Sequence, residues 1–280
     1  MTQSSTPRVA VGLPVYNGEN YLRIAIESVL AQTFRDFELI ICDNVSTDST
    51  AAICAAYAER DSRVRYHRNP RNLGAAPNFN MTFKVISPSV EYFRWISHDD
   101  TMSPDSLEKS VRALDAHPER VLCTSLIGMI DADGTQTSVY DSGLQAARNS
   151  DQPSERFFDT ALRKHNNYDT YGLIRRSALE NSLMMPSYYA GEKTTLVELS
   201  VRGKFFHIPE VLFSVREHAQ RATSAISRLN WLSNEDTSAS RWLQIGTLMM
   251  FLDYCRIVNR HVKAPAERLR CYRMLVQWWF

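Results

Sequence analysis

Residues 9–50 read VAVGLPVYNGENYLRIAIESVLAQTFRDFELIICDNVSTDST, and this stretch decides the fold. An apolar run, Val9–Leu13, ends at Pro14 and is followed by a polar turn. A periodic helix is predicted at Tyr21–Gln32, before a second apolar run at Phe37–Cys42. Parallel strands joined by a helix present their carboxyl ends at one edge of a sheet, where open α/β sheets bind ligands. The stretch therefore predicts half of a nucleotide-sized crevice.

The same alternation continues downstream. Further strands are expected at Val64–His67, Tyr92–Ile96, Val121–Met129, Tyr171–Arg175, Phe205–Ile208 and Val211–Arg216. Helices are predicted at Thr50–Arg60, near Pro77–Ile86, from Ser103 to Ala116, near Ser154–Arg163 and from Gly191 to Arg202. The pattern weakens between Thr137 and Tyr168, where we expect loops beside one helix, and Asp131–Gly134 is typical of a hairpin turn. The fold class is α/β, with a mostly parallel sheet covered by helices on both faces.

The end of the chain has a different character. From Ser227 onward the pattern is helical, and Pro265 separates two helices. We expect an α/β domain at residues 1–222 and a helical C-terminal extension at residues 223–280. Residues 241–280 carry seven Arg and Lys side chains against two acidic ones, and aromatic residues lie between them. This pattern fits peripheral contact with a membrane that bears acidic lipids, a homodimer interface, or packing on the first domain.

The composition is that of an ordinary globular protein, 280 residues long with 44% hydrophobic and 22% charged residues. A formal net charge of +1 gives no reason to expect nucleic acid as a partner. The five cysteines show no disulfide or metal-type spacing, which favours a reducing compartment. Because the sequence begins without an apolar signal region and has no apolar run long enough to span a bilayer, we expect a cytoplasmic protein, with attachment to the inner face of the membrane as an option.

Acidic side chains follow several of the predicted strands. Asp99 and Asp100 lie where the strand Tyr92–Ile96 meets solvent. Adjacent carboxylates at that edge can hold a divalent cation that bridges phosphates, and the alternative is a solvated pair that opens a loop. Asp43 and Asn44 end the second strand, where a carboxylate can accept the imide N–H of uracil and a carboxamide offers both a donor and an acceptor. The alternative for this pair is turn formation and helix capping.

A further carboxylate, Glu192, follows Gly191 at the start of a predicted helix. The positive end of the helix dipole favours negative charge there. Glu192 is therefore either an ionised carboxylate available for chemistry or an ordinary first-turn acidic residue.

Segments in the first hundred residues resemble one enzyme family, the family 2 glycosyltransferases with the GT-A fold. These segments are PVYNGE (14–19), SVLAQTF (28–34), DNVSTDST (43–50), NLGAAPNFN (72–80) and WISHDD (95–100). The resemblance implies transfer of a sugar from a nucleotide diphosphate donor, with inversion at the anomeric carbon. UDP is the commonest donor nucleotide in the family, and the implied acceptor is a hydroxyl of a glycan, a lipid-linked sugar or a small molecule.

The resemblance also implies which residues bind the donor: Pro14, Tyr16, Glu19, Asp43, Asn44, Asn72, Gly74, Asp99, Asp100 and Arg216. In the family, the second aspartate of an Asp-x-Asp-Asp segment ligates Mn²⁺ or Mg²⁺, and that position is Asp99 here. Ser97 stands at the first position, so a carboxylate is missing there. Arg216 and His218 resemble an Arg-x-His element that approaches the donor diphosphate, which makes His218 a second candidate metal ligand.

The family places its general base in an acidic motif before a helix. A segment that resembles RGKFFHIPEVLFSVREH, residues 202–218 here, follows that helix. The resemblance therefore implies that Glu192 is the catalytic base, with Lys193 in place of a second acid. Asp169 is the reserve candidate for the same role.

Two other functions stay open at this point. A nucleotidyltransferase that makes sugar nucleotides usually carries a Gly-rich, basic phosphate loop after its first strand, whereas LPVYNGE (13–19) has one glycine and no lysine. The second alternative is a non-catalytic scaffold that binds a nucleotide or a sugar. A donor hydrolysis assay would separate the scaffold from an enzyme.

Overall fold

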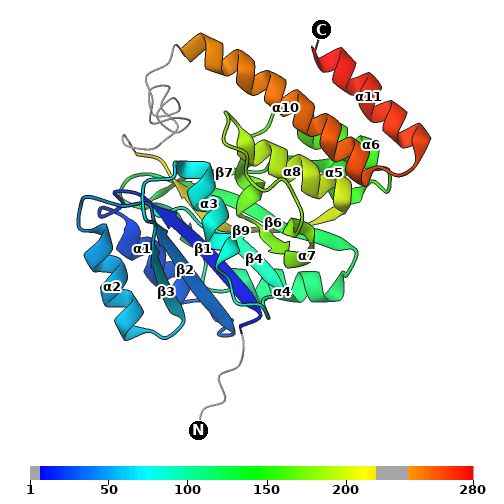
Figure 1. Cartoon of the computed structure of the whole chain (residues 1–280). Coiled ribbons are helices and arrows are strands. Elements are labelled where there is room, and N and C mark those ends of the chain that lie inside the picture. Colours follow the sequence, from blue (N-terminus) through cyan, green and yellow to red (C-terminus); the bar gives the residue numbers. More distant parts are fainter. Residues whose placement is uncertain (1–6, 219–238, 280) are drawn as a thin grey trace.

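The computed structural model describes residues 7–218 and 239–279. Its strands are β1 (Val9–Val15), β2 (Phe37–Asp43), β3 (Val64–Arg68), β4 (Tyr92–Trp95), β5 (Thr101–Met102), β6 (Arg120–Ile130), β7 (Gln136–Tyr140), β8 (Leu173–Arg175) and β9 (Lys204–Arg216). Its helices are α1 (Leu22–Leu30), α2 (Thr50–Arg60), α3 (Ala75–Lys84), α4 (Ser106–Ala116), α5 (Gln145–Asn149), α6 (Pro153–Ala161), the 3₁₀ helix η1 (Asn167–Tyr171), α7 (Arg176–Leu179), α8 (Gly191–Arg202), α10 (Ala239–His261) and α11 (Pro265–Trp279). Helices flank a central sheet, which confirms the α/β fold class (Figure 1).

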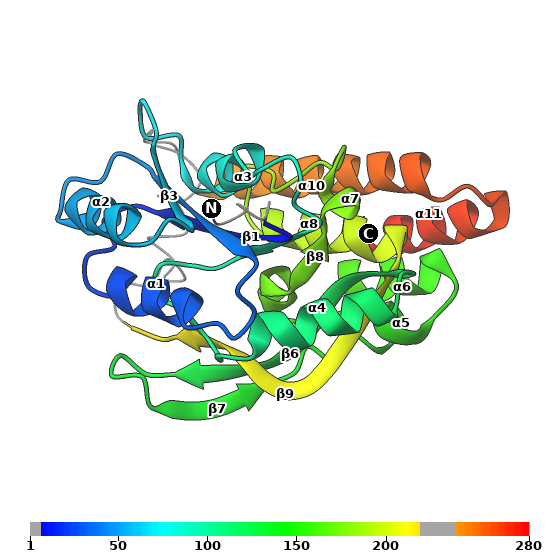
Figure 2. The same cartoon turned by 90° about the horizontal axis from the view of Figure 1, so that it is seen from below.

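The sheet has the strand order β3-β2-β1-β4-β8-β6-β9-β5, with β7 paired to β6. Pairing is parallel from β3 through β2 and β1 to β4, so the ends of these strands meet at one edge. Beyond β4, the strands β6 and β9 also pair in parallel, whereas β8, β5 and β7 pair antiparallel with their neighbours. Figure 2 shows β6, β7 and β9 together, away from β3. The sheet is therefore parallel in its first part and mixed in its second.

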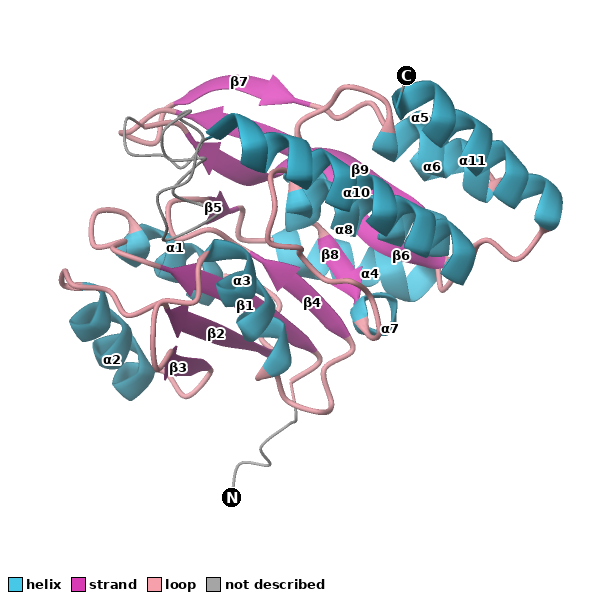
Figure 3. Cartoon of the chain, turned by 45° about the horizontal axis from the view of Figure 1, so that its top comes forward, coloured by secondary structure: helices cyan, strands magenta, loops and turns pink. Residues whose placement is uncertain are grey.

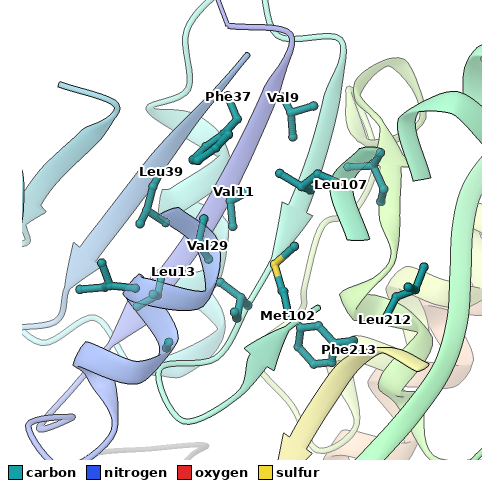
Figure 4. Packing of buried hydrophobic residues seen from close by; sticks show 14 of the residues in the cluster. Val9, Val11, Leu13, Val29, Phe37, Leu39, Met102, Leu107, Leu212 and Phe213 are labelled. Carbon is teal, nitrogen blue, oxygen red and sulfur yellow. The ribbon is translucent and has the colours of Figure 1, made fainter. Parts of the chain in front are cut away.

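The first strand is a continuous apolar run because both of its faces are covered. All of β1 is buried. Val9, Val11 and Leu13 pack on the face that carries α1, α2 and α4, whereas Ala10 belongs to the core on the opposite face. Figure 4 shows the first three residues beside Val29 of α1. A strand buried in this way fixes where β1 ends, and it thereby fixes the position of the polar loop that follows.

The C-terminal helices α10 and α11 pack on α8 and α6 through a separate apolar cluster. Its members include Phe157, Val197, Tyr254, Val258 and Leu275. Figure 3 shows α10 lying along α8. Packing on the rest of the chain, one of the three roles considered for this segment, is therefore confirmed for these helices. In the part of the chain that the structure describes, no helix has both the length and the apolar character needed to cross a membrane.

Some expectations from the sequence need correction. The segment expected as loops after Thr137 includes the strand β7, which has mostly exposed residues and therefore gave no apolar signal. The two strands expected at Phe205–Ile208 and Val211–Arg216 form the single strand β9, whose pairing with β6 shifts register around Pro209. A proline lacks the N–H that a regular ladder needs, so it is tolerated at such an irregularity. The domain boundary expected at residues 222 and 223 lies outside the described residues.

Candidate active site

The loops that follow β1 and β2 are joined by hydrogen bonds between side chains of one loop and the backbone of the other. Asn17 N donates to Ser46 Oγ at 2.9 Å, and Asn17 Oδ1 accepts from Thr47 N at 2.9 Å. Gly18 N donates to Thr50 Oγ1 at 2.9 Å. Because the two strands are parallel neighbours, their carboxyl ends bring these loops into contact. Each loop therefore holds the other in place.

Three of the predicted donor-binding residues lie in or beside the first of these loops. Pro14 is buried within β1, opposite Cys42 of β2. Tyr16 is 47% exposed. Glu19 is exposed, and its Oε2 accepts from Ser49 N at 3.0 Å. Glu19 therefore stabilises the joined loops, and Tyr16 presents its ring to solvent beside them.

Asp43 lies at the end of β2, and its side chain is fully buried. Its Oδ1 accepts from Ser46 N at 2.8 Å, and its Oδ2 accepts from the Tyr66 hydroxyl at 2.9 Å. The guanidinium of Arg68 lies 3.3 Å from the same Oδ2. The expected turn-forming role is therefore present. A carboxylate has about four lone-pair positions, so these contacts leave acceptor capacity for one more donor.

Asn44 and Asn72 are bonded to each other rather than pointing to solvent. Asn44 Nδ2 donates to Asn72 Oδ1 at 2.7 Å and to the carbonyl of Gly74 at 3.2 Å. Asn44 Oδ1 accepts from Asn69 Nδ2 and from Leu73 N. Gly74 has a φ of 83°, in the region that favours glycine. These amides therefore shape the loop before α3 on the same edge of the sheet.

Asp99 and His218 form the centre of a second group. His218 Nε2 lies 3.0 Å from Asp99 Oδ2, and both side chains are largely buried. Arg216 Nε donates to the backbone carbonyl of Asp99 at 3.0 Å, and Arg216 N donates to Asp100 Oδ1 at 2.9 Å. The Arg216 Nη1 group donates to the carbonyls of Asp131 and Ala132. Arg216 was expected to bind phosphate. Its N–H groups instead donate to the Asp99–Asp100 segment and orient it.

Two residues that sequence reasoning missed connect this group to the first loop. The ring of Tyr21 lies 4.8 Å from the Arg216 guanidinium carbon and 4.8 Å from the His218 ring. A Cβ added to Gly18 would lie 2.7 Å from the His98 ring, so glycine permits this close approach. Burial lowers the pKa of His98. Tyr21 gave no signal because it opens an ordinary helix, whereas His98 could have been noticed within the polar run after β4.

The donor atoms available to a cation fit Mn²⁺ or Mg²⁺ only in part. Asp99 supplies carboxylate oxygen and His218 supplies imidazole nitrogen, both suitable for Mn²⁺. Within residues 7–218 and 239–279, no group of three or more His, Cys, Asp or Glu residues is arranged to hold a metal ion. Mg²⁺ commonly takes one or two carboxylates and completes its shell with phosphate oxygens and water. The arrangement therefore suits a cation that is bound together with a diphosphate.

Glu192 lies in the first turn of α8, and its two carboxylate oxygens have different surroundings. Its Oε1 accepts from Asn167 Nδ2 of η1 at 3.2 Å. Its Oε2 is buried and has no hydrogen-bond partner among the described residues. Ala190, directly before the helix, adopts a left-handed conformation with a φ of 59°. A Cβ on Gly191 would lie 2.1 Å from the carbonyl oxygen of Pro186, so the turn before Glu192 requires a glycine there.

The 3₁₀ helix η1 links the segment of Asp99 to Glu192. At one end of η1, the Tyr171 hydroxyl lies 2.8 Å from Ser97 Oγ, two residues before Asp99. The Tyr171 ring also stacks on Phe213 of β9 at 5.0 Å. At the other end, Asn167 holds Glu192. The two ends of η1 are thus bonded to Ser97, two residues before Asp99, and to Glu192.

Asp169, the reserve candidate for the base, lies in the same η1 but has other neighbours. It is 6% exposed, and burial raises its pKa, while hydrogen bonding to Ser142 and the positive charge of Arg148 act in the opposite direction. Burial also lowers the pKa of Lys193, the residue in place of a second acid. The contacts of Asp169 thus run toward α5, whereas Glu192 contacts the start of η1.

Comparison with known proteins gives a consistent result. The family model described as glycosyl transferase family 2 matches residues 10–183. An uncharacterized glycosyltransferase of Rickettsia typhi is 36% identical over 109 residues, which are 39% of this chain and 32% of that protein. The EpsH protein of Bacillus subtilis is 29% identical over 216 residues, which are 76% of this chain and 56% of EpsH. The chain thus spans about a third to about half of the length of these relatives.

Solved structures show the same fold. TarS of S. aureus, residues 1–349, in complex with UDP-GlcNAc, superposes with a TM-score of 0.66 at 17% identity over 97% of this chain and 71% of that one. The mannosyltransferase PcManGT from Pyrobaculum calidifontis, in complex with GDP-Man and Mn²⁺, gives a TM-score of 0.58 at 13% identity over 99% of this chain and 82% of that one. Because the family model covers more than half of the sequence, this chain belongs to the family 2 glycosyltransferases.

Proposed function

We propose that this glycosyltransferase inverts the anomeric carbon, using a nucleotide diphosphate sugar as donor and a hydroxyl group as acceptor. The observation that carries the proposal is the link through η1, which connects the Asp99 segment with Glu192. A metal-binding carboxylate and a general base are the two groups that such a single displacement requires on opposite sides of the anomeric carbon.

The donor nucleoside would occupy the edge formed by the loops after β1 and β2. Asp43 would accept the imide N–H of uracil at its remaining lone pair once the loops around its buried carboxylate move to admit the base. The exposed ring of Tyr16 offers an apolar face for the base. Asn44, Asn72 and Gly74 would act by holding the neighbouring loop. The UDP-GlcNAc bound to TarS is consistent with this assignment.

The diphosphate would lie beside Asp99 and His218. These two residues would hold Mn²⁺ or Mg²⁺, which stabilises the charge that develops on the departing diphosphate. Arg216 and Asp100 would keep Asp99 in position through their bonds to each other and to the backbone. The Mn²⁺ bound to PcManGT supports a cation of this kind.

Glu192 would act as the general base. Its Oε2 would take the proton of the acceptor hydroxyl while the acceptor oxygen forms a bond to the anomeric carbon. The bond between that carbon and the diphosphate oxygen breaks in the same step, and the nucleoside diphosphate leaves with the electron pair. Asn167 would keep the carboxylate in one orientation through its bond to Oε1.

The test of the base is Glu192→Gln, which keeps the shape of the side chain and removes its basicity. General-base catalysis typically contributes ~10²–10⁴-fold, so sugar transfer should fall by about that factor. Glu180→Gln, a change in an exposed carboxylate, is the matched control and should transfer sugar at the wild-type rate. Wild-type turnover in the Glu192 variant would reject the assignment.

The donor and the metal can be tested together by thermal shift. UDP, GDP, dTDP and CMP are each compared with Mn²⁺ and with EDTA, and a ligand at 100 times its Kd stabilises by about 2.7 kcal/mol. UDP with Mn²⁺ should give the largest shift. Asp99→Ala should remove the metal-dependent part, whereas Asp133→Ala, in the exposed turn after β6, should not. Equal shifts for UDP in Mn²⁺ and EDTA would contradict the metal assignment.

The acceptor would approach from the side of η1 and α8. A glycan, a lipid-linked sugar or a small molecule each offers the hydroxyl that Glu192 needs. Leu248, Met249 and Leu252 of α10 remain exposed, beside the basic residues of the same segment, and this supports peripheral contact with a lipid surface. Binding to vesicles with and without acidic lipids would test that contact.

A further inference from the structure

The segment directly before Glu192 adopts a backbone conformation that its own residues do not favour. Asn181, Met184 and Ala190 all adopt left-handed φ values, between 56° and 59°. Such a conformation is uncommon for residues other than glycine, and it persists where the surrounding structure imposes it. The conformation of residues 181–190 must therefore depend on contacts with other elements.

A buried chain of hydrogen bonds from α10 supplies one of these contacts. The Tyr188 hydroxyl donates to Asp253 Oδ2 at 2.8 Å. The same hydroxyl lies 2.9 Å from Thr194 Oγ1, which can donate to it. Asp253 and Thr194 are both buried, and Asp253 Oδ1 also accepts from Arg256 Nη1 at 2.7 Å. Since Thr194 lies two residues after Glu192, this chain connects α10 to the helical turn that carries Glu192.

Another contact from α10 holds the beginning of the same segment. Glu198, in the middle of α8, accepts from Leu183 N through Oε2 at 2.7 Å. Its Oε1 lies 2.8 Å from His261 Nε2, near the end of α10. The segment before Glu192 is thus fixed to α10 near both of its ends.

Tyr254 lies where α10 packs on α8, the helix that carries Glu192. Tyr254 follows Asp253 in the sequence and is fully buried beside Phe157 and Trp278. Burial raises the pKa of Tyr254, and the negative charge of Glu192 adds to the effect. Figures 1 and 3 both show α10 lying along α8. The helix α10 therefore packs on α8, the helix whose first turn carries the proposed base.

We infer that Asp253 is a positioning residue for Glu192 and acts through Tyr188 and Thr194. The inference rests on the proposed role of Glu192 as the base. Asp253 does not contact the reacting atoms. It fixes the first turn of α8, and a displacement of about 1 Å there can cost roughly 10²-fold in rate. In this view α10 contributes to catalysis because it fixes the position of Glu192.

The experiment measures transfer rates and UDP–Mn²⁺ thermal shifts on the full chain. Asp253→Ala removes the acceptor for Tyr188, and Tyr188→Phe removes the hydroxyl alone; each should lower kcat by roughly 10–10²-fold and leave the UDP shift unchanged. Asp253→Asn keeps an oxygen that can accept from Tyr188 and should restore most of the rate. Arg256→Ala, which removes the exposed partner of Asp253, is the matched control and should transfer at the wild-type rate.

A double variant separates positioning from general damage. If Asp253 acts through Glu192, adding Asp253→Ala to Glu192→Gln should give no further loss, because the two changes affect one interaction. Multiplied losses, or a wild-type rate in both Asp253→Ala and Tyr188→Phe, would overturn the inference. A wild-type rate in Glu192→Gln alone would instead overturn the proposed function. A lost UDP shift in Tyr188→Phe would also count against positioning, since the damage would then reach the donor site.

Discussion

The first part of the molecule, residues 7–100, and the second part, residues 120–216 with α10, hold their functional loops in different ways. In the first part, neighbouring loops bond to each other, as Asn17 does to Ser46 and Thr47. In the second part, the segment before Glu192 is held by α10 and by Asn80 of α3, both far away in the sequence. The difference indicates that the loops after β1 and β2 are fixed within the parallel sheet, whereas the turn of Glu192 also depends on elements far away in the sequence.

The two parts also differ in how well their buried polar atoms are satisfied. Among the described residues, the buried side-chain atoms without a hydrogen-bond partner are Asn69 Oδ1 and Arg94 Nε in the first part, and Asn167 Oδ1, Asp169 Oδ2, Thr170 Oγ1, Glu192 Oε2 and Tyr254 Oη in the second. Buried polar groups in folded proteins are nearly always hydrogen-bonded. Five of these seven atoms lie in η1, α8 and α10, so the polar groups of the second part are less completely satisfied by the protein itself.

Among these predictions, Gly191→Ala should produce the largest effect on the rate of sugar transfer. A small effect would contradict the difference between the two parts. The new Cβ would lie 2.1 Å from the carbonyl oxygen of Pro186, so the start of α8 must move. A shift of about 1 Å at a catalytic group can cost roughly 10²-fold, and transfer should fall by at least about that factor. The UDP–Mn²⁺ thermal shift should persist, because the loops after β1 and β2 are held by bonds to each other.

The control for this variant is Gly143→Ala, whose Cβ would meet no atom within 4 Å but whose φ of 64° strains any other residue, at a cost of order 1–3 kcal/mol in stability. It should leave transfer unchanged. If Gly191→Ala kept the wild-type rate, the turn before Glu192 would not be held as tightly as the contacts indicate. If Gly191→Ala lost UDP binding together with sugar transfer, a change in the second part would also have disturbed the first part.

The sequence predicted the first part well because its signals are local. The apolar runs of β1 and β2 and the polar cluster Asp43–Asp48 each identify an element within a few residues. The grouping of Asp43 and Asn44 at one edge followed from strand direction alone. What strand direction could not predict is that Asn44 bonds to Asn72, since that pairing depends on the path of a loop.

The second part was harder to predict because its elements depend on distant partners. The strand β9 of this part pairs with the short strand β5, which lies far away in the sequence outside both parts, and β7 has mostly exposed residues. Glu192 was noticed at the start of a predicted helix, but its expected role as the base came from a resemblance, because an acidic residue in a first turn also has an ordinary use. Neither Asn167, which holds Glu192, nor Tyr188, which connects it to α10, carries a sequence signal, because a single polar residue in a loop has many ordinary uses.

Gly74→Ala tests the first part with a change that strains the backbone without crowding it. Gly74 has a φ of 83° and a ψ of 170°, and a Cβ there would approach no closer than 4.0 Å to its nearest neighbour, Pro77. A residue other than glycine in this region costs of order 1–3 kcal/mol. The free energy of unfolding in urea should fall by about 2 kcal/mol, and UDP binding should weaken because Gly74 lies in the loop held by Asn44.

The transfer rate of Gly74→Ala tests whether strain in the first part reaches the turn of Glu192. At saturating UDP-sugar, Gly74→Ala should transfer at close to the wild-type rate, since the turn of Glu192 is held from α10. A loss of kcat as large as that of Gly191→Ala would show that strain in the donor loop reaches the base.

The smallest expected effect concerns His207 of β9, a buried titratable group of the second part. Its Nδ1 lies 3.1 Å from Thr124 Oγ1, and its Nε2 lies 3.9 Å from Asp141 Oδ2. Burial and the positive charge of Arg148 together lower the pKa of His207 to about 4, although Asp141 acts in the opposite direction. Asp141 stays ionised through this range, because its hydrogen bond with Arg148 lowers its own pKa to about 2.

A histidine with a depressed pKa binds fewer protons in the folded state than in the unfolded state. Its contribution to stability is complete above the unfolded pKa of about 6.5 and is lost as the pH falls from there toward about 4. Between pH 7 and pH 5.5 the loss should be about 1 kcal/mol in urea unfolding. His207→Gln should remove that part of the pH dependence, whereas His117→Gln, at a half-buried histidine in the loop after α4, should keep it. If the free energy of unfolding of the His207 variant kept the wild-type dependence on pH, the acid sensitivity would belong to other groups.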